Sequence, residues 1–195
     1  MKREASITRK TLETDIAVTL VIGGEAFHCI ETGIPFFNHM LTLFAVHGGF
    51  GLKVDAKGDL DVDCHHTVED VGLVLGEAVF KVIGDRKGIT RYGNAVTPMD
   101  ETLATVTIDL SNRPYLVYNT PSSNGDGRLF DIALAKEFFR AFAVKSGMNL
   151  HINVHYGENE HHILEAIFKS LGRSLKQAVS IDPAYTSVLS SKGAL

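Results

Sequence analysis

The sequence predicts an α+β protein that arose by internal duplication of one unit rich in β-strands and carrying two helices. Residues 44–54 (FAVHGGFGLKV) match residues 142–152 (FAVKSGMNLHI) at a constant offset of 98. Adjacent histidines recur as well, at 65–66 and at 161–162, with an offset of 96. Self-similarity at a fixed spacing is the signature of a repeated architecture. We therefore expect half-domains at residues 1–85 and 86–195, folded as one globular unit.

The first half begins with strands. Residues 4–30 alternate in hydropathy around Gly23-Gly24, a pattern that predicts a β-hairpin. Residues 35–47 then predict a helix, with proline in its first turn and glycines after its end. A strand pair is expected around residues 57–59, before the helix that carries the first two histidines.

The start of that second helix has two readings. Thr67 and Asp70 have the spacing of a capping box, which would leave the two histidines in front of the helix. Without the cap, the histidines lie on the helix, whose apolar period runs to Gly84.

The second half repeats the order of elements. Residues 102–110 and 115–118 predict strands around a turn with proline, and the tail at 180–195 has no strong period. The remaining predicted elements are a helix at 130–144, a strand at 150–155 and a helix at 160–179.

Each histidine pair is followed by a carboxylate four residues after its first member. Because positions i and i+4 share one face of a helix, His65 with Glu69, and His161 with Glu165, can each offer nitrogen and oxygen to one ion. The second histidine of each pair is rotated by about 100° and points elsewhere. The offset of 98 also relates His39 to Glu137. The candidate metal ligands are His39, His65, His66, Glu69, Glu137, His161, His162 and Glu165.

Imidazole and carboxylate without thiolate suit a borderline-to-hard divalent ion such as Mn, Fe, Co, Ni or Zn. A structural zinc site would more often use cysteines. The chain has no phosphate-binding loop, nucleophile elbow or dinucleotide fingerprint. These residues alone support a metal-dependent lyase or hydrolase acting on a small anionic substrate.

The composition limits the kinds of partner that this protein is expected to bind. A net charge of −4 gives no basic field for nucleic acid. No window approaches the roughly 18 continuous apolar residues of a membrane span, and the first residues lack the apolar core of a signal peptide. Cys29 and Cys64 do not make a disulfide framework, so a cytoplasmic location is expected.

Several polar residues are ambiguous by themselves. Glu13, Arg91 and Arg113 would ordinarily be solvated surface residues. The Ser-Ser-Lys run at 190–192 would ordinarily be a frayed terminus. Its hydroxyls and ammonium could instead order over an anionic ligand.

Four segments together resemble the signatures of the imidazoleglycerol-phosphate dehydratase family: residues 33–41, 63–70, 161–166 and 190–193. The resemblance extends over residues 3–192. It implies two homologous α+β half-domains whose four-stranded sheets carry helices on one face, as in domain 2 of ribosomal protein S5. It also implies a homo-oligomer of 24 subunits with two Mn²⁺ ions per active site, placed where subunits meet. The implied reaction is the dehydration of D-erythro-imidazole-glycerol phosphate to imidazole-acetol phosphate in histidine biosynthesis, by a chain without a phosphatase domain.

The resemblance also assigns roles. The eight candidate ligands match the family's metal positions, although Glu137 stands where many members have histidine. Glu13 matches a catalytic carboxylate, which reverses its ordinary interpretation. Leu43 departs from relatives that place glutamine near the substrate. The residues that would hold the substrate phosphate, partly from the C-terminal tail, are Arg91, Arg113, Lys169, Ser190, Ser191 and Lys192.

Two other functions remain as alternatives. A metal-dependent hydrolase of a small phosphorylated substrate would release phosphate instead of forming a ketone. A non-catalytic metal-storage or assembly protein would use its histidines to join subunits and would leave the arginine and tail residues without a ligand.

Overall fold

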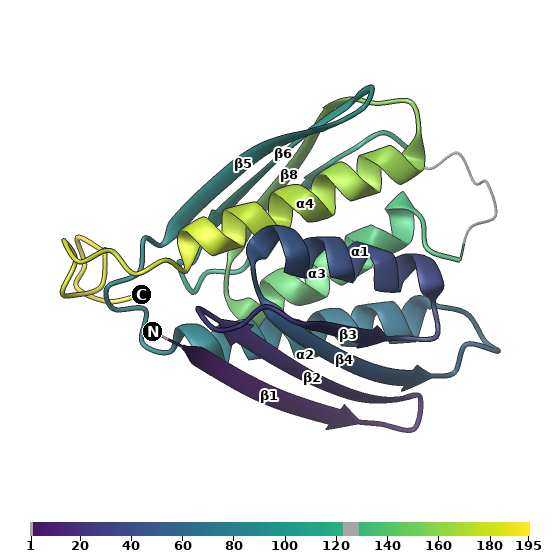
Figure 1. Ribbon diagram of the computed structural model, residues 1–195, viewed down its shortest axis with the longest axis horizontal. Coiled ribbons are helices and arrows are strands. Elements are labelled where there is room, and N and C mark those ends of the chain that lie inside the picture. Colours follow the sequence, from purple (N-terminus) through teal and green to yellow (C-terminus); the bar gives the residue numbers. More distant parts are fainter. Residues whose placement is uncertain (1, 123–128) are drawn as a thin grey trace.

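Two four-stranded sheets enclose a layer of four helices in the computed structural model, which describes residues 2–122 and 129–195 (Figure 1). The first sheet has the order β1-β2-β4-β3 and the second has the order β5-β6-β8-β7. The predicted α+β internal duplication is therefore confirmed. The strands are β1 (Arg3–Lys10), β2 (Thr14–Ile22), β3 (His28–Glu31), β4 (Gly51–Gly58), β5 (Tyr92–Met99), β6 (Thr102–Asp109), β7 (Tyr115–Asn119) and β8 (Asn149–Tyr156). The helices are α1 (Pro35–Gly48), α2 (His65–Ile83), α3 (Ile132–Ser146) and α4 (Glu160–Ala178).

The helices of the two halves pack on one another, α2 on α3 and α1 on α4. Aromatic rings join them: the Phe138 ring lies 5.4 Å from the Phe37 ring and 5.5 Å from the Phe168 ring, and all three side chains are buried. Ring contacts at these separations add to the energy of burial. The hydrophobic core is thus continuous across both halves.

Glycine permits the closest approach between α1 and α4. A Cβ on Gly172 would lie 2.4 Å from the carbonyl oxygen of Phe44, a distance that the two backbones could not tolerate. Gly72 has the same function on α2, where a Cβ would lie 2.7 Å from the carbonyl oxygen of Phe138. These close contacts set how the helices are rotated within the layer, and therefore which of their faces reach solvent.

The predicted hairpin around Gly23-Gly24 was wrong, as was the strand pair at 57–59. β1 pairs antiparallel with β2, so the hairpin turn lies at residues 11–13. β3 pairs parallel with β4 instead of with β2, and β4 ends at Gly58. Glycines mark a change of direction, but local patterns do not encode which strand becomes the neighbour.

In the second half the predicted strands exist, but β6 and β7 are not neighbours, because β8 lies between them. The sequence also missed β5. The inward positions of β5 are Gly93, Ala95 and Thr97, which produce no alternation of large apolar residues. Small residues are needed there because a Cβ on Gly93 would lie 1.9 Å from the carbonyl oxygen of Ser174 on α4.

Helix α2 begins at His65, with Cys64 as its N-cap residue, so the proposed cap at Thr67 is not formed. Both histidines of each pair thus lie in the first turn of a helix. Across the described residues, none of the helices is long and apolar enough to cross a membrane.

Candidate metal centre

His39, His161 and Glu165 form the candidate metal centre, here called the α1–α4 cluster. Their ligand atoms all lie within 4.8 Å of one another. His39 Nε2 is 2.9 Å from Glu165 Oε1, and His161 Nε2 is 3.0 Å from the same oxygen. This is the i, i+4 arrangement expected from the sequence, completed by a histidine from the other half. In the described part of the chain, the three residues are the one group that converges in this way.

The donor set fits a divalent ion. Two imidazole nitrogens and one carboxylate oxygen suit Mn²⁺, Fe²⁺ and Zn²⁺. Burial alone would raise the pKa of Glu165, but hydrogen bonds from Lys169, His39 and His161 outweigh burial and lower the pKa to about 2. The carboxylate is therefore ionised at neutral pH, as a metal ligand must be.

The corresponding residues of the other half, His65, Glu69 and Glu137, lie on α2 and α3 and are called here the α2–α3 cluster. His65 Nε2 is 3.7 Å from Glu69 Oε2. Arg140 forms an ion pair with Glu137, and its Nη2 atom also lies 3.8 Å from Glu69 Oε1. One guanidinium offsets part of the charge of the two carboxylates. The His65–Glu69 separation of 3.7 Å also makes this cluster looser than the α1–α4 cluster.

The second histidine of each pair points away from both clusters. The two rings of each pair stand at 83° in the first half and 81° in the second. His66 Nδ1 lies 3.0 Å from Asp59 Oδ2, and His162 Nδ1 lies 2.7 Å from Glu101 Oε2. These hydrogen bonds raise the pKa of both histidines. His66 and His162 are thus not part of either cluster within one chain.

Glu13 lies at the turn between β1 and β2, with its side chain about half exposed. Its Oε2 atom is 4.0 Å from His66 Nδ1, and its carbonyl oxygen accepts the N–H of Asp59 at 3.1 Å. The turn is anchored by buried Asp70, which accepts hydrogen bonds from Thr14 Oγ1 and from Arg9. The structure therefore places an accessible carboxylate on an anchored turn beside a histidine.

The residues expected to bind phosphate fall into separate groups. Lys169 adjoins the α1–α4 cluster, since its Nζ atom is 2.6 Å from Glu165 Oε2. Arg91 lines a hollow of about 540 Å³ together with Ser190 and Ser191. Arg113 lines another hollow, of about 370 Å³, on the second sheet. Lys192 is exposed in the tail, and its backbone N–H donates to Ser190 Oγ at 3.2 Å.

Arg91 is already engaged inside the chain. Its Nε and Nη2 atoms donate to Asp109 at 2.7 and 3.1 Å, and its Nη1 atom donates to the carbonyl oxygen of Leu189 at 2.5 Å. The backbone of Arg91 is in the left-handed region, with φ of 69°. This arrangement fixes the start of β5 and ties the tail to it.

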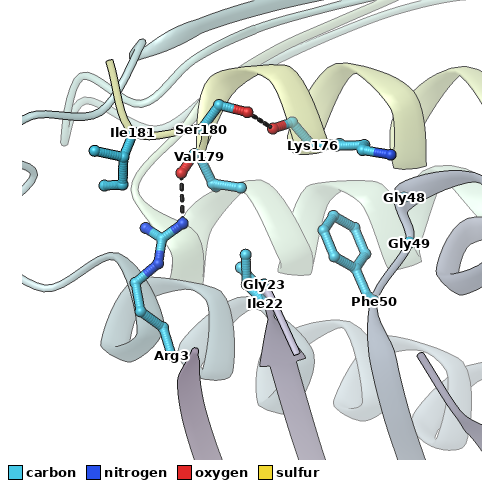
Figure 2. A pocket seen from close by; sticks show the side chains of 10 residues that line it. All are labelled: Arg3, Ile22, Gly23, Gly48, Gly49, Phe50, Lys176, Val179, Ser180 and Ile181. Atoms are coloured by element: carbon cyan, nitrogen blue, oxygen red, sulfur yellow. Dashed lines mark hydrogen bonds between the residues drawn. The ribbon is translucent and has the colours of Figure 1, made fainter. Parts of the chain in front are cut away.

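A further cavity of about 350 Å³ lies at the C-terminal ends of α1 and α4 (Figure 2). Arg3 donates to the carbonyl oxygen of Val179 at 2.5 Å, and Lys176 lies near the end of α1 at Gly49. Cations at helix C-termini offset the negative end of the helix dipole. That explains the two basic residues, and none of the candidate ligands lines this cavity.

Sequence reasoning missed Asp59, Asp70, Glu101 and Arg140. Asp59, Glu101 and Arg140 contact predicted site residues, and Asp70 anchors the turn that carries Glu13. All four lie in turns or on helix faces. The sequence held one signal for Asp70: it directly follows the candidate ligand Glu69 in the run His-His-Thr-Val-Glu-Asp.

The fold and the site define a duplicated α+β protein with a candidate metal-binding group on its helix layer. A family model described as imidazoleglycerol-phosphate dehydratase matches residues 32–175. Relatives of that name from Desulfosudis oleivorans and Trichlorobacter lovleyi are 60% and 56% identical, each over the full length of both chains.

The solved structures agree with the sequence relatives. The crystal structure of the protein from Pyrococcus furiosus matches with a TM-score of 0.85 and 38% identity, covering 97% of this chain and 100% of that one. The Staphylococcus aureus enzyme matches with a TM-score of 0.81 and 38% identity, covering 93% of this chain and 100% of that one. The chain belongs to the imidazoleglycerol-phosphate dehydratase family, and it is an enzyme of the hydro-lyase class.

Proposed function

We propose that this chain is a Mn²⁺-dependent dehydratase that converts D-erythro-imidazole-glycerol phosphate into imidazole-acetol phosphate in histidine biosynthesis. The observation that carries the proposal is the α1–α4 cluster, in which two imidazoles and an ionised carboxylate converge within 4.8 Å. A divalent ion bound there would act as a Lewis acid toward the imidazole ring of the substrate.

The chain's own residues supply proton transfer and orientation. Glu13 is the carboxylate proposed to move a proton at the glycerol arm, since its side chain is accessible and its turn is anchored by Asp70. Lys169, adjacent to the α1–α4 cluster, is proposed to hold the substrate phosphate near the reacting atoms. Binding energy from the phosphate then orients a carbon whose proton is only weakly acidic.

The separation of these groups supports an assembled enzyme. Glu13 and His66 lie together on the first half, whereas Lys169 lies with the α1–α4 cluster, and Arg91 lies with the tail. We propose that neighbouring copies of the chain bring the sets together, with two Mn²⁺ ions per active site in a particle of 24 subunits located in the cytoplasm.

The test is a product assay on the purified protein with imidazole-glycerol phosphate as substrate. We expect ketone formation without release of inorganic phosphate, loss of activity after chelation, and recovery on addition of Mn²⁺. Phosphate release would instead identify a hydrolase. Full activity in protein shown to be free of metal would contradict the proposed metal dependence, and sedimentation of the same sample tests the assembly.

A further inference from the structure

The duplication places Glu13 and Glu101 at corresponding positions. Glu13 directly precedes Thr14, the first residue of β2, and Glu101 directly precedes Thr102, the first residue of β6. Both threonines are buried, and each glutamate lies at the turn of the hairpin that contains the edge strand of its sheet. Each glutamate also lies near the second histidine of its own half.

The two glutamates differ in what holds them. Glu101 Oε2 is 2.7 Å from His162 Nδ1, while its Oε1 atom accepts the backbone N–H groups of Glu158 and Asn159 at 3.3 and 2.9 Å. Thr102 Oγ1 also donates to Oε1, at 3.1 Å. Both oxygens of Glu101 are therefore engaged in hydrogen bonds.

In the first half, Asp59 and not the glutamate forms the hydrogen bond with the second histidine. Asp59 Oδ1 and Oδ2 lie 3.3 and 3.0 Å from His66 Nδ1, whereas Glu13 stays 4.0 Å away. Asp59 thus makes the contact that Glu101 makes in the second half. Within the described residues, the carboxylate of Glu13 makes only the longer ion pair with His66, and more than half of its side chain is exposed.

A carboxylate that only accepts hydrogen bonds determines the tautomer of a neutral histidine. The proton must reside on Nδ1, the atom facing the carboxylate, so Nε2 keeps its lone pair. At His162 the other nearby acid is Asp100, whose Oδ2 atom is 3.8 Å from Nε2, beyond hydrogen-bonding distance, and whose side chain is largely exposed. Nε2 is thus the atom left open to a ligand.

We propose that Glu101 and Asp59 are positioning residues that hold His162 and His66 as Nδ1-protonated imidazoles, so that each binds the metal ion through Nε2. This inference rests on the proposed function, in which both histidines are metal ligands. Outer carboxylates of this kind fix the orientation of a ligating histidine and raise its basicity.

The deciding variants are Glu101→Gln and Asp59→Asn, studied in the full-length, metal-stripped protein by calorimetric titration with MnCl₂. A glutamine can keep its carbonyl oxygen on the N–H groups of residues 158 and 159. Its amide nitrogen then donates toward Nδ1, which moves the histidine proton to Nε2 and blocks the ligand atom. Glu158→Gln and Asp61→Asn are the matched controls, because both side chains are exposed in the adjacent turns.

We expect the Kd for Mn²⁺ to rise about 10- to 100-fold in each variant, with the controls unchanged. The melting temperature of the metal-free protein should stay the same in Glu101→Gln, since the backbone contacts are kept. The inference is overturned if both variants bind Mn²⁺ as the wild type does, or if the melting temperature falls in parallel with affinity. Failure of the wild type itself to bind Mn²⁺ would contradict the proposed function instead.

Discussion

Lys169 Nζ lies 2.6 Å from Glu165 Oε2, one helical turn further along α4, while the other oxygen of Glu165 faces His39 and His161. One carboxylate therefore divides its two oxygens between an ammonium group and the candidate metal centre. The side chain of Lys169 is 14% exposed, so this ion pair is largely shielded from water. The metal centre and the proposed phosphate contact are thus linked by a single side chain.

Replacing Lys169 by methionine should weaken substrate binding more than turnover. The change removes a charged contact worth roughly 1.5–3 kcal/mol, so we expect KM to rise about tenfold or more. Steady-state kinetics with imidazole-glycerol phosphate provide the measurement. Lys176→Met, on the same helix in the cavity of Figure 2, should leave KM unchanged.

The metal-free protein should lose stability in acid partly through Glu165. Its pKa of about 2 in the folded chain lies below the usual 4.5. A depressed pKa contributes stability that is complete above pH 4.5 and is lost as the pH falls toward 2. Melting temperatures between pH 7 and pH 3 should fall below pH 4.5, and the fall should be shallower in Glu165→Gln. An identical slope in the variant would contradict this assignment.

Glu13→Gln should reduce kcat by about 10²- to 10⁴-fold, the range for loss of a general acid or base. Binding of Mn²⁺ should be retained, because Asp59 and not Glu13 makes the hydrogen bond to His66. The control is Glu4→Gln on β1, whose exposed carboxylate pairs with Lys2 at 2.7 Å. Unchanged turnover in Glu13→Gln would remove Glu13 from the proton-transfer step.

Asp70→Asn should destabilise the turn that carries Glu13. A neutral amide replaces the carboxylate that accepts from Arg9 and Thr14, at a cost of about 1.5–3 kcal/mol. We expect a lower melting temperature and a lower kcat together. Asp15→Asn, which removes an exposed ion pair with Lys10, should change neither.

Arg91→Lys should loosen the tail. Lysine cannot reproduce the guanidinium fork that binds Asp109 and the carbonyl oxygen of Leu189 together. Limited proteolysis should therefore cleave within residues 180–195 faster in the variant than in the wild type. The same rate in both would show that the fork does not hold the tail.

The histidine positions could be predicted from sequence because helical geometry and the repeat act over short distances. The i, i+4 spacing predicted the pairing of His161 with Glu165, and the repeat added His39 as a candidate ligand, which the fold brings to that pair. The order of the strands could not be predicted in this way. β2 pairs with β4, although β3 and α1 lie between these strands in the sequence, and no residue pattern near Gly23 specifies that partner.

The residues around the site were harder to find. Glu101 and Asp59 contact histidines that lie 61 and 7 residues away in sequence, through turns whose shape only the folded chain defines. Strand β5 was not predicted because α4 packs closely against it. Its inward positions therefore hold small residues such as Gly93 and Ala95, which give no alternation of large apolar residues.

The single helix layer shared by the two sheets has a consequence for how the protein evolved. Half of this chain, expressed alone, would expose the helix surfaces that now cover Phe37, Phe138 and Phe168. An ancestor encoded by one copy of the unit would thus have needed to pair with itself before the gene doubled. The fusion would have made that homodimer permanent and allowed its two members to diverge.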